Sequence, residues 1–415
     1  MAVRVVDKMV FNEGIELLPE PDDPQMLTAV DRDAPGYPAL DYGLEGWQDP
    51  PSRHDWFHPF RPPLPWGFVS LIAGLVMIVA FTPAIEALLF GPLIPDSEWA
   101  FEVTEIRTLG DEGLTGSGVN VCLVDTGIDI SHPDLQSAKI LGYLDLVTAN
   151  NSVVIDHGGD YHGTMMAGIL VAQGELKGAA PNVRLSVAAA LGMGGLAHGE
   201  QTIADAIHWC WSVMDADIIS LSLGGIADPD MPLTGETVNA VNEALDLGIF
   251  VIAAAGNDGP GTADVSTPAN IPGVIAVAAL DKSGQIWEDS SSGSVKIGGT
   301  NESRTDPHKK PEVSAPGVDI ISTSDPKQSV PYSLSSGTSD STVFVTGALS
   351  LILERHEDAL FSTHPDDGRA RIDLVKTALM ISSNGGSELD HNIRSGYGGL
   401  SAKQWESQVG ILLTT

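Results

Sequence analysis

Cysteine is almost absent from this sequence, with only Cys122 and Cys210 among 415 residues. This scarcity excludes a cysteine-clustered metal site, and it also excludes a small disulfide-rich scaffold. Cys122 lies in a strand-like run, V-N-V-C-L-V, whereas Cys210 lies in a helix-like run. From these two settings we expect a pair of buried thiols, and a single disulfide is the alternative that the sequence leaves open.

Basic residues are also scarce, because 21 Lys and Arg stand against 55 Asp and Glu and give a net charge of −34. Most of the acidic residues follow residue 61, so the excess is spread over the chain and is not a terminal tail. No basic cluster exceeds the pair Lys309-Lys310, which excludes nucleic-acid binding through a basic patch. We expect a well-hydrated acidic surface, or in a sharper interpretation an adaptation to high salt, where ions screen self-repulsion.

Charged residues are missing altogether from residues 62–85, and the centre of this stretch, 66–82, is apolar over about one membrane width. Aromatic residues of the kind found at membrane interfaces gather at its N-terminal end: Trp56, Phe57, Phe60 and Trp66. We therefore expect a transmembrane anchor over residues 62–90, and a buried core helix is the alternative. The stretch lies too far from residue 1 to be an ordinary cleaved signal peptide.

Residues 1–61 are acidic and rich in Pro, Gly and Asp, without sustained periodicity, so we expect a largely disordered segment. The charges that flank the anchor predict its orientation. Arg53 and Arg61 precede the uncharged stretch 62–85, whereas five acidic residues follow this stretch before the first base, Arg107. The positive-inside rule then places residues 1–61 in the cytoplasm and the C-terminal part outside the cell. The short stretch between anchor and domain predicts folding without a removable folded pro-segment.

From residue 97 onward, short strand-like apolar runs alternate with helical ones. The strand-like runs are residues 120–124, 185–191, 218–223, 249–255, 274–280 and 319–323. Apolar residues at helical spacing occupy 203–214 and 238–245. This alternation predicts an α/β domain over residues 97–415, with a mostly parallel sheet covered by helices on both faces. Functional residues of such sheets gather at the carboxyl ends of the strands.

Four short motifs carry side chains with complementary chemistry. They are V-D-T-G-I-D with Asp125, H-G-T-M-M-A-G with His162, A-A-A-G-N-D-G with Asn257, and S-S-G-T-S-D-S with Ser339. A serine hydroxyl needs a histidine to accept its proton, and the histidine needs a carboxylate to orient it. A side-chain amide and a backbone N–H would stabilise the oxyanion. Each residue alone is typical of a turn or a helix cap, but their order and flanks together favour a serine hydrolase.

This order resembles that of the subtilisin-like serine peptidases, the S8 family, over roughly residues 98–408. Segments 113–135, 162–168, 267–277, 314–318 and 397–402 are similar to motifs of that family. The resemblance implies a three-layer subtilisin-like fold and an endopeptidase that acts through an acyl-enzyme. It assigns the triad to Asp125, His162 and Ser339, and the oxyanion donor to Asn257.

The resemblance also implies how a peptide or protein substrate would bind. Ser222, Leu223 and Gly224 match the edge segment that pairs with the substrate backbone. Ala254, Ala255 and Gly256 match the wall of the pocket for the residue before the cleaved bond. The chemistry would require no cofactor, while members of the family often bind structural calcium at Asp-rich loops. Asp129, Asp134 and Asp258 are candidate ligands among which the sequence does not choose.

The serine motif departs from the family's usual pattern, in which Met-Ala follows the nucleophile and a helix-start proline comes soon after. Here Asp340 follows Ser339, and Val343 replaces the proline. A carboxylate at this place opposes the formation of an oxyanion. The departure motivates an alternative from another class, a catalytically silent peptide-binding module of the same fold at the cell surface.

The histidine motif departs from the pattern as well, because Met165 replaces a common second histidine. Just before it, His157 stands close to Asp156 and Asp160. These residues are compatible with a metal site, but their spacing matches no standard helical ligand pair. A loop that leads into the helix of His162 is the favoured interpretation.

Overall fold

The computed structural model describes residues 68–79, 97–383 and 390–414. The chain divides into two units, Met1–Gly91 and Pro92–Thr415. In the first unit, residues 68–79 form a helix whose large apolar side chains, such as Leu71 and Val79, are exposed. Within the described parts of the chain, no helix is both long enough and apolar enough to cross a membrane. Residues 1–61 and most of the predicted anchor 62–90 lie outside the described residues.

A seven-stranded sheet organises the second unit, and every neighbouring pair of its strands is parallel. The strands are β1 (Asn120–Asp125), β2 (Lys139–Asp145), β3 (Arg184–Ala189), β4 (Ile218–Leu221), β5 (Phe250–Ala254), β6 (Ile275–Leu280) and β7 (Val313–Pro316). Their order is β2-β3-β1-β4-β5-β6-β7. The predicted α/β class with a mostly parallel sheet is confirmed.

Four strands differ from the sequence prediction, three because they were not predicted and one because it lies in another sheet. β2 and β7 were not predicted, because β2 is a half-exposed edge strand and β7 is short and ends in Pro316. The run 319–323 was predicted as a strand like the others, but β8 (Ile320–Thr323) lies outside the main sheet. It pairs antiparallel with β9 (Tyr332–Ser335) in a separate hairpin. Strand propensity is local, whereas the choice of sheet depends on distant partners.

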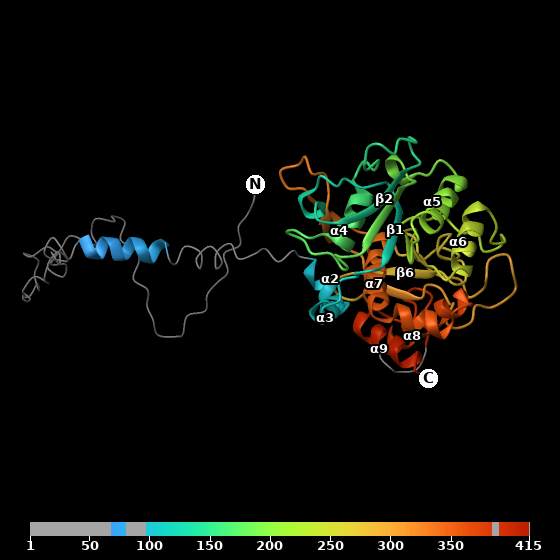
Figure 1. Ribbon diagram of the computed structural model, residues 1–415. Helices are drawn as coiled ribbons and strands as arrows, with labels where there is room; N and C mark the ends of the chain where they lie inside the picture. Colours follow the sequence, from blue (N-terminus) through green and yellow to red (C-terminus); the bar gives the residue numbers. More distant parts are fainter. Residues whose placement is uncertain (1–67, 80–96, 384–389, 415) are drawn as a thin grey trace, which may run out of the picture. The chain divides into compact units, whose positions relative to one another are not determined.

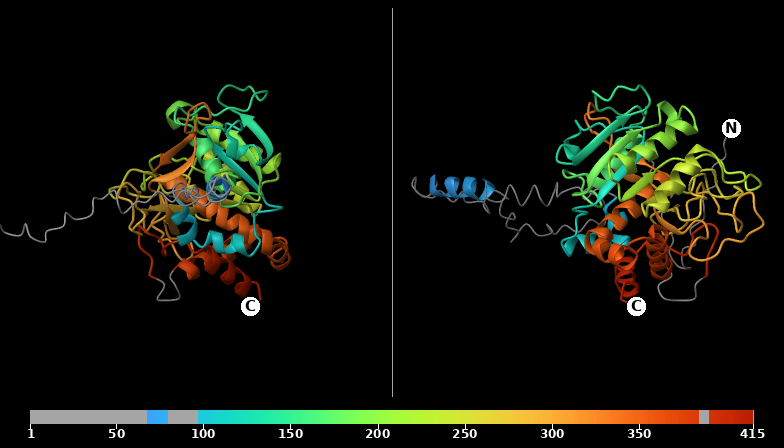
Figure 2. Two further views of the ribbon diagram at one scale, coloured as in Figure 1. Left: turned by 90° about the vertical axis from the view of Figure 1, so that its left-hand side faces the viewer. Right: turned by 45° about the vertical axis from the view of Figure 1, so that its right-hand side comes forward.

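Helices cover both faces of the main sheet, so the domain has three layers (Figure 1). α4 (His162–Val171) and α7 (Thr338–Thr363) pack together on one face, and α5 (Glu200–Ser212) and α6 (Glu236–Asp246) pack together on the other. The remaining helices are α2 (Glu98–Val103), α3 (Ile106–Asp111), α8 (Gly368–Ser383) and α9 (Ala402–Leu412). α8 and α9 pack against each other at the C-terminal end of the chain, as the turned views also show (Figure 2).

The first sixteen residues of α7 are buried even though seven of them carry polar side chains. The hydroxyls of Thr342, Thr346 and Ser350 donate to the carbonyl oxygens four residues earlier, at 2.7, 2.9 and 2.8 Å. These local bonds satisfy hydroxyls that would otherwise be costly to bury. α7 begins at Thr338, so Val343 lies inside the helix and is not at its start. The interpretation of Val343 as a helix-start position was therefore wrong.

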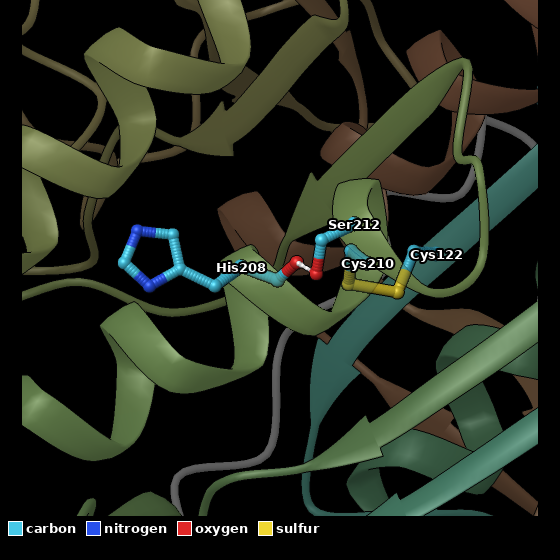
Figure 3. Close-up of a disulfide and its surroundings, with 4 residues drawn as sticks. All are labelled: Cys122, His208, Cys210 and Ser212. Carbon is cyan, nitrogen blue, oxygen red and sulfur yellow. Dashed lines mark hydrogen bonds between the residues drawn. A yellow bond between two sulfur atoms is a disulfide. The ribbon is translucent and has the colours of Figure 1, made fainter.

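Cys122 of β1 and Cys210 of α5 form a disulfide across 88 residues of chain, with their Cα atoms 5.7 Å apart (Figure 3). The expectation of two buried thiols was wrong. A strand-like run and a helix-like run reveal that each side chain is buried, but they do not reveal that both point at the same spot. The disulfide ties the helix layer to the strand that ends in Asp125, three residues after Cys122.

Replacing both cysteines by alanine should lower the free energy of unfolding by about 4 kcal/mol, because the cross-link restricts a long loop in the unfolded chain. Denaturant unfolding of the two proteins would measure the difference. A reductant should destabilise the native protein by a similar amount and leave the double variant unchanged. Equal unfolding midpoints for both proteins would contradict the stabilising role of the disulfide.

Candidate active site

The strand ends bring together the polar residues that the sequence singled out. Asp125 is the last residue of β1, Ser222 follows β4, and Asn257 follows β5. These three strands are neighbours in the sheet and run in the same direction, so their carboxyl ends meet at one edge. His162 is the first residue of α4, and Ser339 is the second residue of α7. Two helix starts therefore point at the same edge.

Buried Asp125 and half-buried His162 form a hydrogen-bonded pair, in which Nδ1 of the imidazole lies 2.8 Å from Oδ1 of the carboxylate. The same oxygen accepts the backbone N–H of Thr126 at 2.6 Å. The pair needs a close approach of α4 to the turn after β1, since a Cβ on Gly163 would lie 2.1 Å from the carbonyl oxygen of Gly127. A carboxylate at Nδ1 fixes the tautomer that leaves Nε2 for proton exchange.

Asp156 holds the segments on either side of this pair through hydrogen bonds, a role that its place in the sequence did not reveal. Its Oδ1 accepts the hydroxyl of Thr126 at 2.6 Å, and its Oδ2 accepts the backbone N–H and the hydroxyl of Thr164 at 2.8 and 2.6 Å. The carboxylate therefore caps the first turn of α4 and joins it to the residue after Asp125. His157 instead pairs with Asp145 at 3.1 Å. His157 therefore lies in a loop that leads into α4, as the sequence analysis favoured.

Asn257 and Ser339 meet at the start of α7. Oδ1 of Asn257 accepts the backbone N–H and the hydroxyl of Thr338, at 3.0 and 2.8 Å. These bonds fix the amide so that its NH₂ group is the end left for a ligand. The Ser339 hydroxyl donates to the carbonyl oxygen of Ser222 at 3.3 Å. It would have to turn toward His162 for proton transfer, as catalytic hydroxyls often do when substrate binds.

Two cavities meet at His162, Asn257 and Ser339. The edge cavity has a volume of about 390 Å³ and is lined by the segment Ser222, Leu223, Gly224 and by Ala254 and Gly256. Ala255, predicted with them, is fully buried behind this wall and does not line the cavity. The hairpin cavity has a volume of about 450 Å³ and adjoins β9, the loop before it, and the starts of α4 and α7.

Carboxylates dominate the electrostatics around His162. Burial alone would lower the pKa of the imidazole, but Asp125 and then Asp340 and Asp160 raise it to about 9. Because the imidazole accepts protons only when neutral, its capacity as a base grows as the pH rises toward and above this pKa.

Asp340 is fully buried beside Ser339, and burial raises its pKa to about 7. Its Oδ2 accepts the hydroxyl of Ser335 at 2.9 Å, which opposes this rise. Its Oδ1 is buried without a hydrogen-bond partner among the described residues. The sequence placed this carboxylate next to the nucleophile, and the structure adds that it belongs to the wall of the hairpin cavity.

The candidate calcium ligands do not fit a calcium site. Both carboxylate oxygens of Asp134 already accept backbone N–H groups, from Glu175 at 3.0 Å and Leu176 at 2.8 Å. Asp129 accepts both the backbone N–H and the hydroxyl of Ser131. Asp258, in the edge cavity, belongs to no suitable cluster: within the described ranges, no three His, Cys, Asp or Glu residues are grouped to hold a metal. A cation at Asp134 or Asp129 would compete with these hydrogen-bond donors for the carboxylate oxygens.

Comparison with known proteins identifies the domain that carries this site. The profile of the Subtilase family matches residues 116–398. The chain is 34% identical over 282 residues to serine protease AprX of Bacillus subtilis (strain 168), which covers 59% of each protein. It is 36% identical over 266 residues to subtilisin E of the same organism, covering 62% of this chain and 61% of the relative. The chain thus spans about three fifths of the length of these relatives.

Replacing Asp340 by asparagine should lower the pKa of His162, because one of the carboxylates that stabilise the imidazolium loses its charge. The neutral base would then persist to lower pH. Histidine ring NMR signals, assigned with a His162→Gln variant, would follow the titration in both proteins. Asp111→Asn, at an exposed position of α3, is the matched control and should leave the midpoint in place. An unchanged midpoint in Asp340→Asn would show that this carboxylate does not act on His162.

Proposed function

The chain belongs to the subtilase family, and from this premise we propose that it is a serine endopeptidase that cleaves peptide bonds through an acyl-enzyme. The observation that carries the proposal is the 2.8 Å bond between His162 Nδ1 and Asp125 Oδ1 at a cavity shared with Ser339 and Asn257. It supplies an oriented base, a nucleophile and an oxyanion donor at one place.

In the first half of the reaction, Ser339 Oγ attacks the peptide carbonyl carbon while His162 Nε2 takes the hydroxyl proton. Asp125 holds the imidazole in place and stabilises the imidazolium that forms. The NH₂ group of Asn257 and the backbone N–H of Ser339, at the start of α7, donate to the oxyanion. His162 then gives its proton to the leaving amine, and the acyl group stays on Ser339.

In the second half, water attacks the acyl carbon while His162 Nε2 takes its proton, and His162 then returns the proton to Ser339 Oγ as the acid product leaves. The substrate backbone before the cleaved bond would pair with Ser222, Leu223 and Gly224. The pocket for the residue there would be walled by Ala254 and Gly256, with buried Ala255 supporting this wall from behind. The edge cavity supports this assignment because the edge segment lines it beside the nucleophile. Every step uses side chains and water, so the proposed chemistry takes no cofactor.

A fluorophosphonate probe, which reacts with activated serines, should label the full-length protein at Ser339. Labelling should disappear in Ser339→Ala, because the nucleophile is gone. The rate of labelling should fall about a hundred- to a thousandfold in Asn257→Ala, because one oxyanion donor is lost.

Asp111→Asn serves as the control and should be labelled at the native rate. A folded native protein that resists the probe would favour the alternative, a catalytically silent peptide-binding module. Asp340, the buried carboxylate next to Ser339, would then be the first residue to revert to the family's usual methionine.

We further propose that a membrane anchor in residues 62–90 tethers the peptidase domain outside the cell, with residues 1–61 in the cytoplasm. The absence of charge from residues 62–85 and the exposed apolar side chains of helix 68–79 support the anchor. The disulfide between Cys122 and Cys210 supports the outside location, since such bonds form in oxidising compartments.

Alkaline carbonate should leave the full-length protein in the membrane fraction of its host and should extract a variant lacking residues 62–90. The reason is that an integral anchor is held by the hydrophobic effect and not by charge. A C-terminal tag should be digested by protease added to intact cells, whereas an N-terminal tag should be protected. Digestion of the N-terminal tag alone would reverse the proposed orientation, and full extraction would refute the anchor.

A further inference from the structure

The hairpin cavity lies on the side of the site that the departing product would use. It shares Asp160, His162, Asn257 and Ser339 with the edge cavity, but the edge segment 222–224 does not line it. Under the proposed function, the edge segment holds the substrate before the cleaved bond. The two parts of a substrate leave the reacting carbonyl in opposite directions, so the part after the bond leads into the hairpin cavity.

The charged lining of the hairpin cavity is acidic. Three carboxylates belong to it, from Asp160 before α4, Asp325 between β8 and β9, and Asp340 in α7. None of the described residues that line it is Lys or Arg. Among the described lining residues, His162 is the one that can carry a positive charge, and it already bonds Asp125. An incoming side chain would therefore meet three carboxyl groups and no Lys or Arg in the described lining.

The described fold leaves one oxygen of these carboxylates without a hydrogen-bond partner. Oδ1 of Asp340 is buried in the cavity wall without a hydrogen-bond partner among the described residues, and Ser335 occupies only Oδ2. Buried polar atoms are nearly always hydrogen-bonded, and an unpaired one is costly. A donor on a ligand in the cavity would complete the hydrogen bonds of this carboxyl group.

The rest of the lining offers little to an apolar ligand. The described lining includes four serines and the apolar side chains of Met165 and Leu334: the serines are Ser324, Ser333, Ser335 and Ser336. The volume of about 450 Å³ lies in the range of ligand pockets, about 300–1,000 Å³. A long side chain with a polar, cationic end suits this combination of size, hydroxyls and carboxylates better than an aliphatic one.

We propose that the hairpin cavity binds the side chain of a Lys or Arg that directly follows the cleaved bond. Asp340 pairs with the cation at the cavity wall, and Asp325 contributes from the loop between β8 and β9. The site therefore selects substrates whose leaving product begins with a basic residue. This inference rests on the proposed peptidase function and adds its specificity on the leaving-group side.

Acyl transfer measures this specificity without interference from the acyl side. A peptide thioester acylates Ser339 of the full-length protein, and added amines then compete with water for the acyl-enzyme. The acceptors are the isomeric dipeptide amides Arg-Gly-NH₂ and Gly-Arg-NH₂, which carry the same charge but differ in where the Arg lies. Their comparison separates the cavity from the general attraction of a protein with a net charge of −34.

Arg-Gly-NH₂ should capture the acyl group about tenfold better than Gly-Arg-NH₂ or Leu-Gly-NH₂, the discrimination expected of one partly desolvated charge pair. Asp340→Asn should remove most of this preference, and Asp325→Asn should reduce it. Both reactions of the acyl-enzyme use His162 as base, so the ratio of the products cancels any change in its pKa. Asp111→Asn should keep the native ratio.

Equal capture of the three acceptors would overturn the inference, and so would an Arg preference that survives in both Asp340→Asn and Asp325→Asn. Asp325 lies on a surface loop, so its variant decides the matter if Asp340→Asn does not fold. Fluorophosphonate labelling of the same preparation distinguishes a failure of the cavity assignment from a failure of the proposed peptidase function. Labelled protein without an Arg preference refutes only the cavity assignment, whereas unlabelled folded protein refutes the peptidase function and this inference with it.

Discussion

The burial of the first half of α7 is the constraint on which the site depends. A helix start inside a protein leaves backbone N–H groups that need partners. Here Asn257 accepts the N–H of Thr338, and the hydroxyl of Ser341 donates to the carbonyl oxygens of Ala315 and Pro316. The same bonds that make the buried helix start tolerable orient the Asn257 amide and place Ser339 at the ends of β1, β4 and β5. The contacts that satisfy the buried helix start are therefore also the ones that build the proposed oxyanion site.

A second layer of side chains gives this edge its geometry. Asp156 links the turn after β1 to the first turn of α4 through the hydroxyls of Thr126 and Thr164. Tyr161, just before His162, has a left-handed backbone with φ of 61°, a conformation that non-glycine residues rarely adopt. Local strain of this kind persists where the surrounding contacts over-determine the backbone, as they do here. The direction of the imidazole follows from this frame.

Negative charge gives the site its chemical character. The carboxylates around His162 raise the pKa of the imidazole, so they lower the fraction of neutral base at a given pH and stabilise the imidazolium that forms in the proposed first half of the reaction. Two of these carboxylates, from Asp160 and Asp340, also line the hairpin cavity. The acidic environment therefore favours the charged imidazole, and a basic residue in the leaving product would supply a donor for the unpartnered oxygen of Asp340.

Much of this protein was readable from its sequence. Asp125, His162, Asn257 and Ser339 stood out because each lies in a short glycine-containing motif after a predicted strand or before a predicted helix. The parallel sheet followed from buried apolar runs such as those of β1, β4 and β5, whose patterns are local. β2 and β7 were missed because half-exposure in one and a terminal proline in the other hide the strand pattern.

The sequence by itself determined which chemical groups are available, their order along the chain and the layered α/β class. Only the tertiary structure decided which of them meet. The pairing of Cys122 with Cys210, the bracing role of Asp156 and the unpartnered oxygen of Asp340 all depend on contacts between segments far apart in the chain. Local patterns report that a side chain is buried, but only the packed fold determines what lies against it.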